Sequence, residues 1–355
     1  MLQSNPQAGV GLAALDRFCR ETLAACGADR ATADAAARAM MHGTRHGVDS
    51  HGIRLLPHYV EALEGGRLNK APKPVTVSAF GAVETLDADH AHGALAAYTG
   101  MERAVALAER FGIGAVAIRN TSHFGPAGAF SIEAARRGHI GFTFANSDSF
   151  VRLHDGAERF HGTNPISVAV PTAGANPWLL DMATSAVPFN RVLLYRSLGQ
   201  PLPQAVASDA RGFDTQDAGQ TAMLAPLGGE FGFKGAGLAG LAEILSAVLT
   251  GMKLSFDIAP MQGPDFSTPR GMGAFVLAIR PEAFIERAAF DEGMNRYLET
   301  LRHSQAREGC RVMAPGDREW DVAARREEQG VAIDPATLSA FEALAQRYGV
   351  AMPGG

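Results

Sequence analysis

The chain has 355 residues, of which 46% are hydrophobic and 19% are charged, and its formal net charge is −5. This length allows two or three domains with a sizeable core. The negative balance argues against a general electrostatic attraction to nucleic acid or to acidic membranes. Three cysteines without a CxxC pair favour a reducing compartment over a disulfide framework. The first residues lack the pattern of a signal peptide, and no apolar run is long enough for a membrane span, so we expect a cytoplasmic protein.

The spacing of hydrophobic residues predicts helices and strands in alternation. In the first third we expect helices at 11–26, 31–41 and about 49–64, followed by extended chain at 75–86. In the middle third the spacing predicts helices at 95–111, 127–137 and 188–198, and strands at 114–118, 140–145, 166–170 and 178–182. The last third predicts a polar loop at 208–220, a strand at 273–279, and helices at 236–249, 282–303, 319–328 and 335–347.

The segment Asp49-Ser50-His51-Gly52-Ile53-Arg54 carries the first chemical signal. On a continuous helix His51, Arg54 and His58 would share one face, with Pro57 as a potential kink. Histidine exchanges protons near neutral pH, and arginine binds a carboxylate bidentately. The pattern therefore indicates a site for an acid whose neighbouring carbon gains or loses a proton. The alternative is a solvated helix start capped by Ser50.

The stretch from Gly235 to Gly240 matches G-x-G-x-x-G, the dinucleotide fingerprint of Rossmann folds. That fingerprint requires a hydrophobic strand directly before it, and residues 226–234 do not form one. We interpret the glycines as positions of close helix packing. Lys234, at the start of the same helix, makes a competent anion site together with the free backbone N–H groups, unless it simply faces solvent.

Six separated motifs occur in one order along the chain. They are Ser50-His51-Gly52, Ser122-His123-Phe124-Gly125, Asn146-Ser147, Gly162-Thr163-Asn164-Pro165, Asp181-Met182-Ala183-Thr184-Ser185, and Pro226-Leu227-Gly228-Gly229 with Lys234-Gly235. This combination resembles the type-2 malate/L-lactate dehydrogenase family, which includes ureidoglycolate, sulfolactate and diketogulonate dehydrogenases and Δ1-piperideine-2-carboxylate reductase. The resemblance extends from about residue 12 to residue 346.

The resemblance implies an enzyme of the α/β (α+β) class that uses NAD or NADP. Its cofactor domain would be of a non-Rossmann type, with a largely antiparallel sheet flanked by helices, at residues 119–299. Residues 1–118 and 300–355 would form a helix-rich domain for substrate binding and dimerisation. The family further implies a homodimer with the active site between domains.

Hydride transfer requires a nicotinamide that faces the substrate carbon and an acid that protonates the developing alkoxide or amine. By resemblance, His51 matches the position proposed as the proton donor in some members, and His123 the proton acceptor in others. Alternatively, His123 caps the following helix. Asp181 is a candidate to orient a histidine and to hold its protonated form.

Positions that contact the cofactor in the family match residues in four parts of this chain. They are Ser147, Asp181, Met182, Ala183 and Lys234, with a further turn at Pro315, Gly316 and Asp317. The alternative for that last turn is a simple Pro-Gly turn before a helix.

The chain departs from the family pattern at the expected substrate arginine. Many members place an arginine four residues after the first-motif histidine, and this chain has Leu55 there. Arg54 lies one residue earlier, which rotates a side chain by about 100° on a helix. Arg54 and His58 are thus both candidates to bind the substrate carboxylate. Two other departures are Leu153-His154-Asp155-Gly156 and Asn190-Arg191.

The leading hypothesis is hydride transfer between a nicotinamide and a small 2-oxo or 2-hydroxy acid similar to malate or lactate. A second is reduction of a cyclic imine carboxylate such as Δ1-piperideine-2-carboxylate or Δ1-pyrroline-2-carboxylate, and a third is a catalytically silent cofactor-binding protein. The sequence does not distinguish NAD from NADP. His42 and His46 lack a third ligand at suitable spacing, so we expect a helix-surface pair and no metal site.

Overall fold

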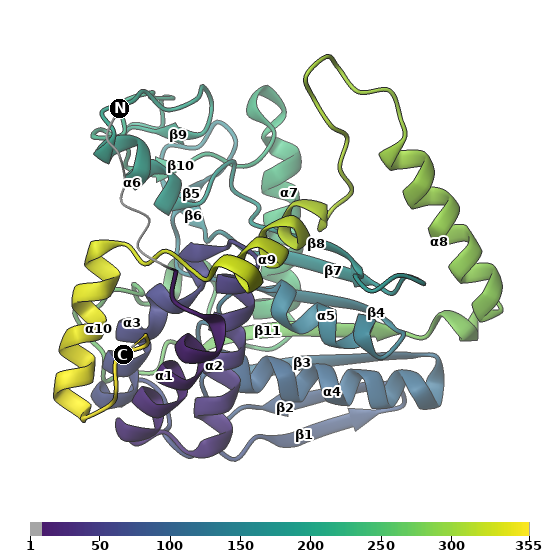
Figure 1. The fold of residues 1–355 in the computed structure, drawn as a ribbon, viewed down its shortest axis with the longest axis horizontal. Helices are drawn as coiled ribbons and strands as arrows, with labels where there is room; N and C mark the ends of the chain where they lie inside the picture. Colours follow the sequence, from purple (N-terminus) through teal and green to yellow (C-terminus); the bar gives the residue numbers. More distant parts are fainter. Residues whose placement is uncertain (1–8, 355) are drawn as a thin grey trace.

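The computed structural model describes residues 9–354, and Figure 1 shows its arrangement. The helices are α1 (Leu12–Ala25), α2 (Arg30–Arg45), α3 (Leu56–Gly65), α4 (Gly93–Phe111), α5 (Gly128–Arg136), α6 (Phe189–Ser197), α7 (Phe233–Glu243), α8 (Arg287–Arg302), α9 (Asp317–Gln329) and α10 (Pro335–Tyr348). The strands are β1 (Val75–Phe80), β2 (Val83–Asp87), β3 (Ile113–Thr121), β4 (Ile140–Ala145), β5 (Val151–Arg152), β6 (Arg159–His161), β7 (Ile166–Val170), β8 (Trp178–Met182), β9 (Ala207–Ser208), β10 (Met223–Leu224) and β11 (Met272–Ile279).

A seven-stranded sheet forms the centre of the molecule, in the order β1-β2-β3-β11-β4-β7-β8. Only the β2–β3 pair is parallel, and the other pairs are antiparallel. The largely antiparallel sheet that the sequence predicted is therefore confirmed. Strand β11 comes from far along the chain and inserts between β3 and β4, which brings the end of β3 and the ends of β4 and β8 to one region.

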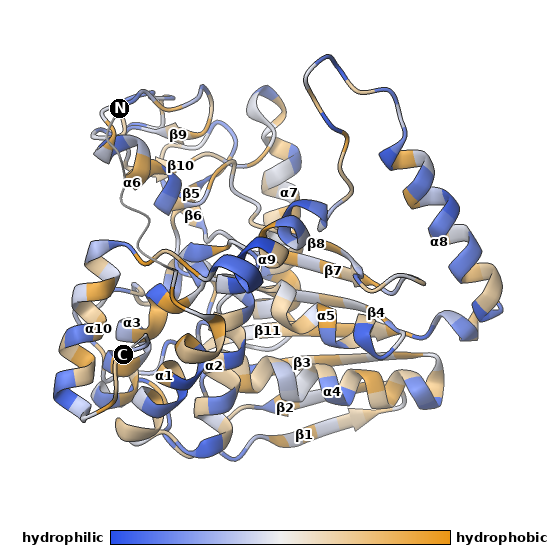
Figure 2. Ribbon diagram, in the orientation of Figure 1, coloured by the Kyte–Doolittle hydropathy of each residue, from blue (hydrophilic) through white to orange (hydrophobic). Residues whose placement is uncertain are grey.

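Alternate residues of β11 point to opposite faces of this sheet. Ala274, Val276 and Ala278 are buried in the core that α4 and α5 complete on one face. Phe275 points to the other face, which is covered by α7 and the π-helical segment η4 (Ile244–Val248). Figure 2 shows hydrophobic residues concentrated in the sheet and in the helices that pack on it, while α9 is largely hydrophilic.

A second core lies among α1, α2, α3 and α10, so helices from the two ends of the chain pack together (Figure 1). Its largest buried side chains include Phe18 and Phe341, whose ring centroids are 4.9 Å apart. The amphipathic patterns of these helices explain this core, because each helix has one apolar face. Helix α10 thus contacts the N-terminal helices α1 and α3, while the division into two domains stays a prediction. The predicted boundary between residues 118 and 119 falls inside strand β3.

A smaller sheet, in the order β6-β5-β10-β9, packs with α6 above one end of the main sheet. The predicted polar loop at 208–220 follows β9. Helix α8 stands apart from the body at the right of Figure 1, and Leu298 is its one buried side chain. Within residues 9–354 no helix is both long and apolar enough to cross a membrane.

Three local expectations are wrong in detail. The predicted helix over 49–64 is broken: η1 (Asp49–His51) and η2 (Ile53–Leu55) are 3₁₀ turns, and α3 starts only at Leu56. Pro57 therefore lies in the first turn of α3, where its missing N–H costs nothing, and does not kink it. The helix predicted at 31–41 is longer: α2 runs from Arg30 to Arg45, and Asp29 caps it by accepting a hydrogen bond from the Thr32 N–H.

His42 and His46 do not form an exposed pair. Their rings are 4.2 Å apart, and His46 packs edge-on against Trp320 of α9 at 4.8 Å. Among the G-x-G-x-x-G glycines, close packing is confirmed for Gly235, where a Cβ would overlap the Leu227 carbonyl oxygen. Gly237 and Gly240 face open space, so packing does not explain those two.

Candidate active site

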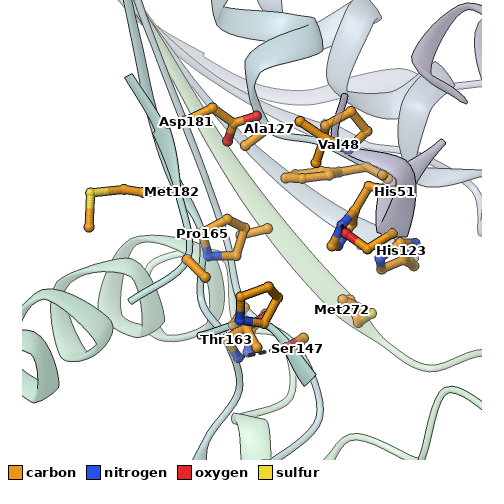
Figure 3. A pocket seen from close by; sticks show the side chains of 18 of the residues that line it. Val48, His51, His123, Ala127, Ser147, Thr163, Pro165, Asp181, Met182 and Met272 are labelled. Carbon is orange, nitrogen blue, oxygen red and sulfur yellow. Dashed lines mark hydrogen bonds between the residues drawn. The ribbon is translucent and has the colours of Figure 1, made fainter. Parts of the chain in front are cut away.

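A cavity of about 260 Å³ lies where the first helical region meets the central sheet. Figure 3 shows His51 and His123 on one side of it, Asp181 and Met182 on strand β8, and Thr163, Pro165 and Ser147 on another wall. Five of the six sequence motifs thus contribute to one space, although they are spread over more than a hundred residues. Of the predicted site residues, the cavity lining includes His51, His123, Ser147, Asp181, Met182 and Ala183.

The local backbone around Gly52 positions His51. Gly52 has φ −96° and ψ −147°, which ends the first 3₁₀ turn and starts a second one in another direction. His51, Arg54 and His58 therefore do not share a helical face, and this expectation is wrong. The Ile53 N–H donates to the Thr44 Oγ1 atom at 2.9 Å, which ties the break to α2.

Helix α9, near the C-terminal end of the chain, further anchors the segment that precedes His51. Arg326 pairs with the Asp49 carboxylate through two hydrogen bonds of 2.6 and 2.9 Å, and it also donates to the Thr44 carbonyl oxygen. A bidentate arginine–carboxylate pair fixes orientation as well as distance. The residues just before His51 are consequently held from two directions.

His51 and His123 are stacked, with ring centroids 5.7 Å apart. The Nδ1 atom of His51 lies 2.8 Å from the Ser50 Oγ atom, and that of His123 lies 2.9 Å from the Tyr59 hydroxyl. Within the described part of the chain neither Nε2 atom has a hydrogen-bond partner, so both remain available to a ligand. Burial lowers the pKa of His51 to about 4. Burial and then the neighbouring His51 lower that of His123 well below its usual value, so both rings are neutral at pH 7.

Asp181 lies on the part of the cavity wall that strand β8 forms. Its Oδ2 atom accepts a hydrogen bond from the Gly128 N–H at 2.9 Å, at the start of α5. A Cβ at position 128 would lie only 2.7 Å from that oxygen, so glycine is required for the approach. Burial raises the pKa of Asp181 to about 6, partly offset by the Gly128 hydrogen bond. No hydrogen bond joins Asp181 to either histidine among residues 9–354.

A buried carboxylate, Glu243, organises the wall that carries Ser147 and Thr163. It accepts hydrogen bonds from the Asn146 and Asn164 amides at 3.2 and 2.7 Å, and from the Ser255 N–H and hydroxyl at 2.6 and 2.5 Å. Asn164 in turn accepts from the Ser147 N–H at 3.3 Å, and Ser147 accepts from the Thr163 N–H at 3.2 Å. Glu243 immediately precedes the π-helical segment η4, a type of distortion frequent at functional sites.

Three of the predicted site residues and one predicted turn lie outside the cavity lining. Arg54 is about half exposed, and its guanidinium forms an ion pair of 3.0 Å with Asp334. His58 packs beside Phe266, with ring centroids 5.8 Å apart, near the buried Arg67 and Arg270. Lys234 is exposed at the start of α7, with its Nζ atom 5.3 Å from the ring centroid of Phe231.

The predicted cofactor turn Pro315-Gly316-Asp317 also lies outside the cavity lining, against the outside of β8. The Leu179 N–H donates to the Pro315 carbonyl oxygen at 3.2 Å, and Gly316 has φ +96°. The Asp317 carboxylate is bound by Arg302 and by the Ala314 N–H. The turn therefore braces the strand that carries Asp181, two residues from Leu179.

The structure adds residues that sequence reasoning missed. Tyr59, eight residues after His51, bonds His123, and its buried position on α3 follows from the apolar pattern of that helix. The Arg270–Asp148 pair flanks the cavity lining, because Asp148 follows Ser147 and Arg270 lies two residues before Met272. Asp148 next to the Asn146-Ser147 motif was a visible signal for the pair, but Arg270 had none.

The family model for malate/L-lactate dehydrogenase matches residues 10–342 of this chain. The chain is 34% identical to the (2R)-3-sulfolactate dehydrogenase (NADP(+)) of Chromohalobacter salexigens, over 88% of this chain and 90% of that protein. Among solved structures, malate dehydrogenase from Entamoeba histolytica superposes with a TM-score of 0.91 at 28% identity, covering 97% of this chain and 99% of that one. Δ1-Piperideine-2-carboxylate reductase from Pseudomonas syringae superposes with a TM-score of 0.83 at 28% identity, covering 95% and 99%.

The sequence motifs, the fold and the arrangement of the cavity agree with these matches. The family uses NAD(H) or NADP(H). The chain belongs to the malate/L-lactate dehydrogenase family and is a dehydrogenase or reductase.

Proposed function

We propose that this enzyme transfers a hydride between NAD(H) or NADP(H) and the carbon next to the carboxylate of a small 2-oxo or 2-hydroxy acid. The observation that carries the proposal is the stacked pair His51 and His123, with both Nε2 atoms free beside a 260 Å³ cavity. Malate and sulfolactate, named for similar proteins, are both 2-hydroxy acids.

The cavity wall formed by Met182, Ala183 and Pro165 suits one face of a flat ring, and Ser147 and Thr163 offer polar groups at its edge. We assign nicotinamide binding to these residues, with Lys234 and the 315–317 turn as candidates for other parts of the cofactor. When bound there, the nicotinamide ring would supply or accept the hydride. The chain's contribution is to position the substrate carbon, to exclude water and to move one proton.

The proton step falls to the histidine pair. A neutral imidazole accepts the hydroxyl proton while a 2-hydroxy acid is oxidised, and the imidazolium returns it in the reverse direction. The Ser50 and Tyr59 hydroxyls hold the two Nδ1 atoms and so direct the Nε2 atoms to the cavity. We favour His51 as the proton donor, with His123 second. Asp181, with its pKa raised to about 6, is a further group that can hold a proton beside the substrate.

A cyclic imine carboxylate is the second candidate substrate, supported by the structural similarity to Δ1-piperideine-2-carboxylate reductase. Both C=O and C=N bonds accept a hydride next to a carboxylate, and they differ in the atom that is protonated.

A substrate panel separates these functions. Purified enzyme is mixed with NADH or NADPH and, in turn, pyruvate, oxaloacetate, 3-sulfopyruvate, 2,3-diketogulonate, Δ1-piperideine-2-carboxylate and Δ1-pyrroline-2-carboxylate, and cofactor absorbance is followed. Turnover of the oxo acids supports the leading function, and turnover of the imines alone supports the second. Cofactor binding without turnover of any substrate would leave a catalytically silent binding protein.

We further propose that the enzyme is a homodimer. Helix α8 projects from the body (Figure 1). Phe284 and Ile285 just before it and Tyr297 on it are exposed. A second apolar surface along α7 and η4 exposes Leu238, Leu241, Ile244, Val248 and Leu249. Contiguous apolar surface of this kind marks protein interfaces. Light scattering after size exclusion should give about twice the 37.3 kDa chain mass, and a monomer mass would contradict the proposal.

A further inference from the structure

The side of the site next to Met272 carries an excess of buried positive charge. Arg270 and Arg67 are 1% and 2% exposed. The Asp148 carboxylate pairs with Arg270, and Asp265, the other acid near Arg67, is exposed and bonded to Ser267 and Thr268. The adjacent rings of His58 and His123 are neutral at pH 7, because burial lowers their pKa values. Two buried guanidinium groups thus share one closely paired carboxylate.

Arg270 has an unused donor in this surrounding. Its Nε donates to the Ala259 carbonyl oxygen at 2.9 Å, and its Nη2 donates to Asp148. Its Nη1 atom is buried and has no hydrogen-bond partner among residues 9–354. A buried donor of a charged group that lacks a partner is costly, and an incoming anion removes that cost.

Arg270 also lies beside the cavity, although it is not among the residues that line it. Its partner Asp148 follows Ser147, and Arg270 itself lies two residues before Met272, so both ends of the pair adjoin the cavity lining. The Arg270 charge also contributes to the lowered pKa values of His123 and His58. By contrast, Arg54 is engaged by Asp334 at the surface, and the family's arginine position holds Leu55.

We propose that Arg270 binds the carboxylate of the substrate through its unpartnered Nη1 group, which side-chain movement uncovers as the substrate enters, in place of the arginine that this chain lacks at position 55. The inference rests on the proposed function, since it assumes a substrate with a carboxylate next to the reacting carbon. Asp148 orients the guanidinium, and one excess positive charge matches one carboxylate.

The test uses oxamate, a non-reacting analogue of a 2-oxo acid, and its neutral counterpart oxamide. Binding of each to the enzyme–NADH or enzyme–NADPH complex is measured by calorimetry. We expect wild type to prefer oxamate, and R270Q to lose oxamate affinity about 30-fold or more, as expected for a charge-assisted hydrogen bond. Oxamide and cofactor affinities should be unchanged. R270K, which keeps the charge without the planar fork, should lie between the two.

R152Q is the matched control, because Arg152 is also a buried arginine paired with an aspartate, Asp214 at 2.6 Å, but in the small sheet. It should bind oxamate like wild type. Thermal melting identifies a variant that does not fold, and R270K then carries the test. An active wild type whose R270Q and R270K variants keep full oxamate affinity overturns the inference, as does a selective loss in R54Q. A wild type that turns over no 2-oxo or 2-hydroxy acid instead refutes the proposed function.

Discussion

Replacing Asp181 with asparagine should change the pH dependence of stability by a calculable amount. Burial raises the Asp181 pKa from 3.8 to about 6, so the folded state binds a proton that the unfolded state releases between these values. The stabilisation linked to this proton is fully present below pH 3.8 and is lost as the pH rises through about 6. The shift corresponds to about 3 kcal/mol at most.

Asparagine removes the titration but keeps an oxygen that can accept from the Gly128 N–H. Relative to wild type, D181N should therefore gain up to about 3 kcal/mol of stability between about pH 4 and pH 7.5. Urea denaturation of both proteins at several pH values gives the difference, in which other titrating groups cancel. D317N is a control of opposite sign, because Arg302 lowers the Asp317 pKa and that carboxylate stabilises the fold above its unfolded pKa. Parallel stability curves for wild type and D181N would refute the reasoning.

The remaining predictions concern the reaction. H51A should lower turnover by about a hundredfold or more while cofactor affinity is kept, as for other general acids; near-normal turnover would move the role to His123. In the oxidation direction kcat/KM should hold as the pH falls through 6.5 and decline only toward about 4, where His51 is protonated; a midpoint near 6.5 that persists in D181N would contradict this. K234A should weaken NAD(P)H binding, measured by fluorescence, more than it slows bound-state chemistry, and unchanged affinity removes that assignment.

The strands of the central sheet and most helices could be predicted because their hydrophobic spacing is local, whereas the four short strands of the smaller sheet were missed. The break at Gly52 could not, because it depends on the Thr44 hydroxyl of a different helix, which binds the Ile53 N–H. The π-helical segment η4 at 244–248 lies inside the helix predicted at 236–249. It could not be predicted either, because it depends on contacts with the sheet and on the hydrogen bonds of Glu243.

The candidate site was likewise predictable only in part. Resemblance brought together His51, His123, Ser147 and Asp181, and all four line one cavity. The pairing of Asp148 with Arg270 joins positions 122 residues apart, and no spacing rule connects them. The helix spacing that suggested Arg54 failed for the opposite reason, because the helix it assumed is not continuous.

Transfer of deuterium from the cofactor tests the central claim most directly. The enzyme is incubated with NADH or NADPH carrying deuterium at both C4 positions of the nicotinamide, together with the oxo acid that the substrate panel identifies, and the product is examined by NMR and mass spectrometry. We expect one deuterium at the carbon next to the carboxylate, and loss of this product in H51A. Oxidised cofactor without deuterium at that carbon, or no reaction with any 2-oxo acid or cyclic imine, would contradict it.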